Sequence, residues 1–161
     1  MKKIKLTRGM VALVDDDDYG LVSKYKWHLS KGEHTFYARA IISKCDKSTV
    51  ITSMHILIMG SKPVLEVDHI NHNGLDNRRI NIRQVTHSQN MCNRFPRRSH
   101  SSIYKGVKWR KSKSKWYAQI GHNGKDIHIG CFNSQEDAAL AYNKYAFEIF
   151  GEHAYLNTVS R

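Results

Sequence analysis

Residues 65–94 constrain the fold more than any other part of this chain, because several structural signals follow one another without a gap. Residues 65–70 (LEVDHI) alternate as a strand does, and residues 79–85 (RINIRQV) form a second strand-like run. Between them, residues 71–74 (NHNG) predict a turn, since Asn and Gly adopt positive φ at little cost. Thr86 is a good N-cap for a helix over residues 86–94. The segment therefore predicts a strand, a loop, a strand and a helix.

The residues before this segment carry further strand and helix signals. Four runs are strand-like, namely residues 3–6, 10–14, 35–42 and 48–53. A helix is expected after four successive aspartates, Asp15 to Asp18, because acidic side chains complement the amides at a helix start. Adjacent carboxylates cannot all converge on one ion, so we expect a solvated helix start there and no metal site. Residues 54–60 (MHILIMG) resemble a short buried helix.

A different pattern begins near residue 103. Residues 104–110, 115–122 and 125–132 are strand-like and separated by short turns, which predicts a three-stranded antiparallel sheet. Ser134 is expected to cap a helix that ends at Gly151, and its alanines imply close packing against that sheet. The predicted fold class is therefore α+β, with a hairpin–helix module followed by a three-stranded sheet packed on one helix.

The charge of the chain indicates a polyanionic partner. Lys and Arg number 26 against 14 Asp and Glu, a formal net charge of +12, and nine of the basic residues lie between Arg94 and Lys115 with no acidic residue among them. Clustered positive charge of this kind favours nucleic acid over a merely solubilising role. Three scattered cysteines favour a reducing compartment, and no apolar run is long enough to cross a bilayer, so we expect a cytoplasmic protein with no membrane partner.

Three side chains in the hairpin–helix segment suit phosphodiester hydrolysis. His69 can act as a general base near neutral pH. The carboxylate of Asp68 and the amide oxygen of Asn90 can hold one Mg²⁺ that keeps most of its water. On a strand, Asp68 and His69 point to opposite faces, so one can bind metal while the other faces water and phosphate.

The same residues resemble the HNH nuclease motif, with its ββα-metal fold, in the form found in phage and intron-encoded homing endonucleases. The resemblance covers residues 54–94 and rests on the spaced set DH, INIR and SQN. It implies Asp68 and Asn90 as ligands of one divalent metal ion, Mg²⁺ or alternatively Mn²⁺. It also implies His69 as general base and Asn81 as the asparagine that braces the hairpin and orients the histidine.

Other readings of this segment remain open. An Asp-His pair alone is more often structural, and His72 could complete an HxxH zinc fragment, although no cysteine lies near it. Asn77 could cap the turn or contact DNA. The arginines of the segment are candidates for phosphate contacts, although solvated arginines fit the pattern about as well; they are Arg78, Arg79 and Arg83.

Residues 104–157 resemble the plant APETALA and ethylene-response-factor DNA-binding domain, through KGVKWRKSKSKWYAQI, HIGCF, EDAALAYNKYAFEIFG and AYLN. That domain lays a three-stranded sheet, backed by one helix, in the major groove. The implied DNA contacts fall on Lys108, Arg110, Lys115 and Trp116, with His128 as a further candidate. Lys105 and Lys108 stand where plant members usually have arginine. Lysine cannot fork onto guanine as arginine does, so a different target sequence is expected.

Together these features predict three parts: residues 1–94 with the nuclease module (core about 54–94), a basic linker over residues 95–103 and a DNA-binding domain over residues 104–161. Arg97 and Arg98 in the linker are expected to contact DNA. The predicted function is a site-specific HNH DNA endonuclease of the homing type, with double-stranded DNA as partner. One active site per chain favours a monomer that nicks, although a dimer could cut both strands. The competing hypotheses are a DNA-binding regulatory protein with an inactive nuclease motif and, more distantly, an RNA-binding protein.

Overall fold

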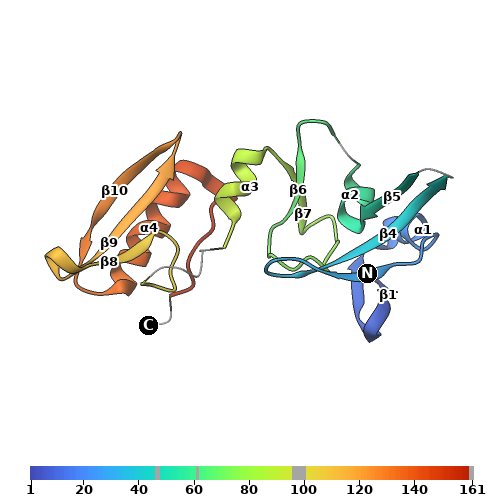
Figure 1. Ribbon diagram of the computed structural model, residues 1–161, viewed down its shortest axis with the longest axis horizontal. Helices are drawn as coiled ribbons and strands as arrows, with labels where there is room; N and C mark the ends of the chain where they lie inside the picture. Colours follow the sequence, from blue (N-terminus) through green and yellow to red (C-terminus); the bar gives the residue numbers. More distant parts are fainter. Residues whose placement is uncertain (46–47, 61, 96–100, 160–161) are drawn as a thin grey trace. The chain divides into compact units, whose positions relative to one another are not determined.

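A computed structural model describes residues 1–45, 48–60, 62–95 and 101–159 (Figure 1). The chain divides into two compact units, Met1–His87 and Ser88–Arg161. Each unit combines helices with small antiparallel sheets, which agrees with the mixed helix and strand content expected from the sequence.

The described residues of the first unit form three small sheets and two α-helices. β1 (Lys2–Lys5) pairs with β2 (Val11–Val14), and a short 3₁₀ turn (Thr7–Gly9) joins them. A three-stranded sheet has the order β3 (His28–Lys31), β4 (Phe36–Cys45) and β5 (Ser48–Ser53), and β6 (Glu66–His69) pairs with β7 (Ile82–Val85). The helices are α1 (Asp16–Val22) and α2 (Met54–Met59). β3 was not predicted, and β7 begins three residues later than expected because the residues before it belong to a loop.

One hydrophobic core joins these elements and fixes the loop between β6 and β7. Val14, Trp27 and Met54 are almost fully buried in it, together with Leu75 from the loop. The backbone of Leu13 on β2 accepts a hydrogen bond from the N–H of Asn77 at 2.8 Å, and its own N–H donates to the carbonyl of Leu75 at the same distance. The N-terminal strand β2 therefore holds the loop between β6 and β7 in place.

In the turn after β6, the residue with positive φ is not the one predicted. The positive φ of residues 71–74 falls on His72, at 60°, and on none of its Asn and Gly neighbours. Gly74 serves close approach instead. A Cβ there would lie 2.5 Å from the carbonyl oxygen of Phe36 and 2.6 Å from the ring of Tyr37. Glycine at this position lets the loop pack directly on β4.

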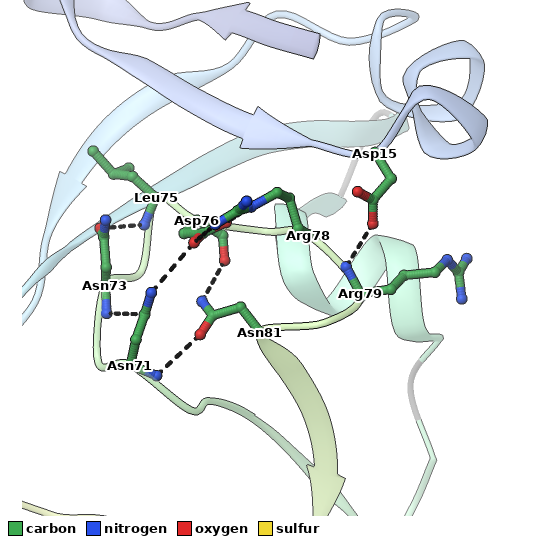
Figure 2. Close-up of polar contacts among 8 residues, drawn as sticks. All are labelled: Asp15, Asn71, Asn73, Leu75, Asp76, Arg78, Arg79 and Asn81. Carbon is green, nitrogen blue, oxygen red and sulfur yellow. Dashed lines mark hydrogen bonds and ion pairs between the residues drawn. The ribbon is translucent and has the colours of Figure 1, made fainter. Parts of the chain in front are cut away.

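The run of aspartates begins a helix, as predicted, but it is not simply solvated. The side chain of Asp18 on α1 is buried, and its two oxygens accept hydrogen bonds from Nε and Nη2 of Arg79 at 2.9 and 2.7 Å. Asp15 accepts the backbone N–H of Arg79 at 2.8 Å (Figure 2). The expectation of a solvated helix start was therefore wrong for Asp18, because a distant arginine supplies its counter-charge.

The second unit contains the expected three-stranded sheet and helix. Its strands are β8 (Val107–Arg110), β9 (Lys115–His122) and β10 (Lys125–Phe132), antiparallel in the order β10–β9–β8. α4 (Gln135–Phe150) packs on this sheet through alanines that are fully buried, and Ser134 Oγ accepts the N–H of Asp137 as its N-cap. Gly151 ends the helix with φ of 54°, as predicted. α3 (His87–Asn93) precedes the sheet, and short 3₁₀ turns lie at Lys111–Lys113 and Gly151–His153.

Candidate active site

The loop between β6 and β7 is organised around the buried carboxylate of Asp76. Arg78 donates to it from Nε at 2.7 Å and from Nη2 at 2.6 Å, and Nδ2 of Asn71 donates at 3.2 Å. Figure 2 shows these groups converging on Asp76 from both sides of the loop. The hydrogen bonds from Arg78 lower the pKa of Asp76 below its ordinary value. This carboxylate is therefore a structural centre of the loop.

Asn81 closes the same loop from the start of the returning strand. Its Oδ1 accepts the backbone N–H of Asn71 at 3.0 Å, and its Nδ2 donates to the carbonyl of Asp76 at 2.7 Å (Figure 2). Asn81 is itself buried. Its side chain thus satisfies one backbone donor and one backbone acceptor across the loop, as a bracing asparagine must.

His69 ends β6 and has a different asparagine beside it. Its Nε2 lies 3.3 Å from Oδ1 of Asn77, whose side chain is fully buried. An amide oxygen only accepts hydrogen bonds, so Nε2 donates to Asn77 in the tautomer that carries its proton there. The imidazole is only 5% exposed, and burial lowers its pKa. His69 is therefore neutral at neutral pH, which is the form that a general base needs.

Two further rings lie beside His69, and no role was predicted for either. The ring of His55, from α2, meets that of His69 edge-on at 4.6 Å between centroids, and Tyr37 from β4 lies 5.9 Å away. His55 is buried, which lowers its pKa to about 3, and its Nδ1 has no hydrogen-bond partner among the described residues. Contacts with these two rings restrict the orientation of the His69 imidazole.

Asp68 lies next to His69 on β6 and faces Arg83 on β7. The two residues are opposite one another in the strand register. Nε and Nη2 of Arg83 lie 3.3 and 3.2 Å from the same oxygen of Asp68, Oδ2. The side chains are only 12% exposed for Asp68 and 14% for Arg83. The carboxylate predicted to bind metal is therefore already paired with a cation of the chain.

The arginines predicted to contact phosphate all have carboxylate partners. Arg78 pairs with Asp76, Arg79 with Asp18 and Arg83 with Asp68. Their contact with DNA stays a prediction, and it requires each guanidinium to share or exchange its partner. Two other predicted contacts, Arg97 and Arg98, lie outside the described residues.

In the second unit, α3 carries Asn90, the second predicted metal ligand, which is half-buried. The end of this helix is fixed by Lys105, whose Nζ donates to the carbonyls of Cys92 and Arg94 at 2.6 and 2.7 Å. Tyr155 donates its backbone N–H to the same Cys92 carbonyl at 3.3 Å. Burial lowers the pKa of Lys105 to about 8. Lys105 therefore anchors α3 to the unit that contains the sheet.

One face of that sheet carries cationic and polar side chains on strands β8 to β10. Tyr117 and His128 stack with ring centroids 4.2 Å apart and an angle of 9° between planes. Arg110 lies 5.0 Å and Lys108 5.9 Å from the Tyr117 centroid. Both cations are exposed, as a surface that binds phosphates and base edges requires.

The two residues of β9 predicted to contact DNA, Lys115 and Trp116, lie on opposite faces of the sheet. Lys115 pairs with Arg110 in the strand register and is exposed. Trp116 pairs with Trp109 at 5.2 Å between ring centroids. It also packs against the buried cluster formed by Val107 and by alanines of β9 and α4. Alternation along the strand puts Trp116 on the face opposite Lys115. A direct contact of Trp116 with DNA stays a prediction, and its observed contacts are those of core packing.

Comparisons with known proteins match both parts of the chain. A family profile described as HNH endonuclease matches residues 60–92, and one described as AP2 domain matches residues 102–152. A protein of Acanthamoeba polyphaga mimivirus, named as an uncharacterized HNH endonuclease, is 34% identical over 154 residues, which cover 94% of this chain and 77% of the viral protein. The chain belongs to the HNH endonuclease family.

This HNH endonuclease family member joins its nuclease segment to an AP2 domain. An AP2-like ethylene-responsive transcription factor of Arabidopsis thaliana is 36% identical over 75 residues, which cover 45% of this chain and 13% of the factor. A rice factor of the same description is 35% identical over 75 residues, or 45% of this chain and 11% of the factor. HNH nuclease and AP2 domains both imply that DNA is the partner.

No solved structure matches this HNH family protein. Within the part of the chain that the structure describes, every helix is too short or too polar to span a membrane. Three residues near His69 were missed or left undecided by the sequence: His55, Tyr37 and Asn77. The alternation of LEVDHI marks His69, but its neighbours come from α2, β4 and the loop, and nothing local predicts that they meet.

Proposed function

We propose that this protein is a site-specific DNA endonuclease of the homing type, which hydrolyses phosphodiester bonds with His69 as general base. The observation that carries the proposal is the geometry of His69 inside the segment matched by the HNH profile. Its ring is buried and neutral, Asn77 contacts Nε2, and the loop beside it is closed by Asn81. A neutral imidazole with a fixed neighbour can take a proton from water.

We propose Asp68 and Asn90 as the residues that hold a divalent metal ion, Mg²⁺ or Mn²⁺. A carboxylate and an amide supply hard oxygen ligands, which suit these ions and leave room for water. The guanidinium of Arg83 lies on the Asp68 carboxylate, so this carboxylate is already oriented toward a cation. The donor chemistry of these two residues therefore suits the ion. When bound, a divalent ion stabilises negative charge on the phosphate and the leaving oxygen.

Sequence choice is assigned to the second unit. The exposed face with Lys108 and Arg110 resembles the side of the AP2 domain that enters the major groove, and Tyr117 stacked on His128 gives that face a rigid base. We propose that phosphate contacts supply most of the affinity, which then falls steeply with salt. Arg97, Arg98 and Lys115 would add to this electrostatic attraction, and Arg78 and Arg79 would do so from the first unit.

Cleavage of supercoiled plasmid tests the proposal directly. Full-length protein in low salt, where phosphate contacts are strongest, is incubated with Mg²⁺, with Mn²⁺ or with chelator. We expect nicked or linear product only with metal, and loss of product in His69→Ala. A matched variant, His34→Ala, removes an exposed histidine of the same unit and should cut normally. Equal cutting by His69→Ala and the unchanged protein would refute the role of His69.

A second candidate function is a DNA-binding protein whose nuclease motif is inactive. The Asp68–Arg83 ion pair and the low exposure of His69 favour it, because both withdraw the predicted catalytic groups from solvent. Tight binding to duplex DNA, with no metal-dependent cutting of any plasmid that carries a bound sequence, would establish this alternative.

A further inference from the structure

The Asp68–Arg83 pair differs from the other ion pairs of the hairpin in its position. Arg78 binds the carboxylate that organises the loop, and Arg79 binds a carboxylate on α1. Arg83 binds the carboxylate adjacent to the proposed base, from the facing position of the neighbouring strand. Of these three arginines, Arg83 is therefore the one paired with Asp68, the carboxylate that the proposed function assigns to the metal ion.

The Asp68–Arg83 pair lies largely out of contact with solvent. Nε and Nη2 of Arg83 lie 3.3 and 3.2 Å from the same oxygen of Asp68, and both side chains are largely withdrawn from water. Screening by water and salt is weaker for partly buried charges than for exposed ones. The pair satisfies the negative charge of Asp68 when no ligand is present, which avoids an unpaired carboxylate at this depth.

A divalent ion on Asp68 would meet this guanidinium at close range. Two cations that share one carboxylate repel each other, so Arg83 must weaken metal binding while it stays on Asp68. A DNA phosphate changes the balance, because a guanidinium binds a phosphate as readily as a carboxylate and in the same forked geometry. The substrate can therefore draw Arg83 away from Asp68.

We propose that Arg83 acts as an exchangeable counter-ion, which occupies Asp68 in the free protein and makes metal binding depend on bound DNA. The inference rests on the proposed function, since it takes Asp68 as a metal ligand. Metal and DNA then bind cooperatively, and each raises the affinity of the other by the same factor. The free protein holds its metal weakly, which suppresses cutting before a phosphate is in place.

Mn²⁺ binding to the full chain, followed by the electron paramagnetic resonance signal of free Mn²⁺, tests this without any measurement of cleavage. Titrations are done with and without a mixed-sequence duplex at low salt, in the His69→Ala background throughout so that the duplex stays intact. In this background, with Arg83 retained, we expect DNA to tighten Mn²⁺ binding about tenfold, within the usual range of coupling between two sites.

Arg83→Gln removes the counter-ion and should change both affinities. We expect Mn²⁺ to bind about tenfold more tightly to this variant without DNA, and the DNA effect to shrink to about twofold or less. Lys24→Gln, measured in the same way, is the matched control: it removes the same charge from an exposed position of the same unit and should leave Mn²⁺ affinity unchanged. Equal tightening in both variants would assign the effect to net charge and overturn the proposal.

Asp68→Asn separates failure of this inference from failure of the proposed site. If Asp68→Asn abolishes Mn²⁺ binding but Arg83→Gln binds like the unchanged protein, the site stands and the counter-ion role is wrong. If Asp68→Asn leaves Mn²⁺ binding intact in every state, the proposed ligand itself fails. Should Arg83→Gln not fold, the His69→Ala background with Arg83 retained still decides, because Mn²⁺ affinity that is insensitive to DNA contradicts the proposal.

Discussion

Nε2 of His69 lies 3.3 Å from Oδ1 of Asn77, and both side chains are buried. The resemblance to HNH nucleases implied that Asn81 orients the histidine. In the structure the two tasks are divided, since Asn81 braces the loop through Asn71 and Asp76 while Asn77 contacts the imidazole. The orientation of the proposed base therefore depends on a residue that the sequence left undecided between a turn cap and a DNA contact.

Replacement of this partner should impair the base without weakening DNA binding. For Asn77→Ala we expect single-turnover cleavage to fall roughly 100-fold, at the low end of what a positioned general base contributes. Asn77→Asp keeps an oxygen near Nε2 and adds a negative charge, which should restore part of the rate and raise the pKa of His69. DNA affinity, measured by fluorescence anisotropy, should stay the same in both variants. No difference in rate between Asn77→Ala and the unchanged protein would exclude the orienting role.

The pH dependence of cleavage should report the burial of His69. Burial lowers its pKa below the ordinary 6.5, so the basic form persists into mildly acidic solution. We expect single-turnover rates that are flat near neutral pH and fall as pH decreases, with a midpoint below 6.5. Rates are measured with Mn²⁺ at saturating concentration at each pH. A midpoint above 6.5 would show that the ring is stabilised as the cation in the active complex.

His55 should make the first unit sensitive to acid. Its pKa is about 3 in the folded chain, mainly through burial and further through the charges of His69 and Arg39, against 6.5 ordinarily. Between these values the unfolded chain binds the extra proton, so stability falls as pH falls through this window and is fully present above 6.5. Two pH units below 6.5, this amounts to about 2–3 kcal/mol.

Urea unfolding at several pH values, with hydrogen exchange of residues 1–87 as the local probe, measures this loss. His55→Leu has no imidazole to protonate, so we expect a flatter dependence on pH below 6.5. His28→Leu, at an exposed position on β3, is the comparison variant and should keep the original slope. Identical slopes for His55→Leu and the unchanged protein would mean that His55 does not resist protonation.

The loop between β6 and β7 should depend on the amide of Asn81. Asn81→Ala leaves the N–H of Asn71 and the carbonyl of Asp76 without their partners, which we expect to cost about 2–4 kcal/mol of unfolding free energy. Asn73→Ala removes one partly buried bond that an exposed side chain makes to the N–H of Leu75, and it should cost less than about 1 kcal/mol. Urea titration of both variants gives the comparison. Equal costs would contradict a bracing role specific to Asn81.

The two faces of the β8–β10 sheet should respond differently to mutation. Arg110→Ala removes an exposed cation, so we expect weaker duplex binding and a salt slope reduced by about one. Trp116→Ala opens a cavity beside Val107 and should cost about 3 kcal/mol of stability, with little change in the affinity of the folded fraction. Anisotropy titrations at several salt concentrations, paired with thermal unfolding, separate these effects. A large loss of affinity in folded Trp116→Ala would restore the predicted DNA contact.

The order of elements was largely available from the sequence because its signals are local. Alternation in LEVDHI and IRQV, Ser134 as a cap and Gly151 as a stop each act within a few residues, and the structure confirms the strands and helices that they predict. The small side chains of the alanines in α4 likewise predicted close packing of this helix on the sheet.

The partners of the polar side chains could be decided only by tertiary structure. Asp18 and Arg79 are 61 residues apart, and Lys105 reaches the end of α3 across 11 to 13 residues, so no local pattern records either contact. A polar group that is buried must find a partner, but which one it finds depends on where the hydrophobic core places distant segments. The sequence therefore determined most of the elements that form and the residues that we propose to carry chemistry. Packing of β2, β4 and α2 around the loop decided that His69 meets Asn77, and the register of β6 with β7 decided that Asp68 meets Arg83.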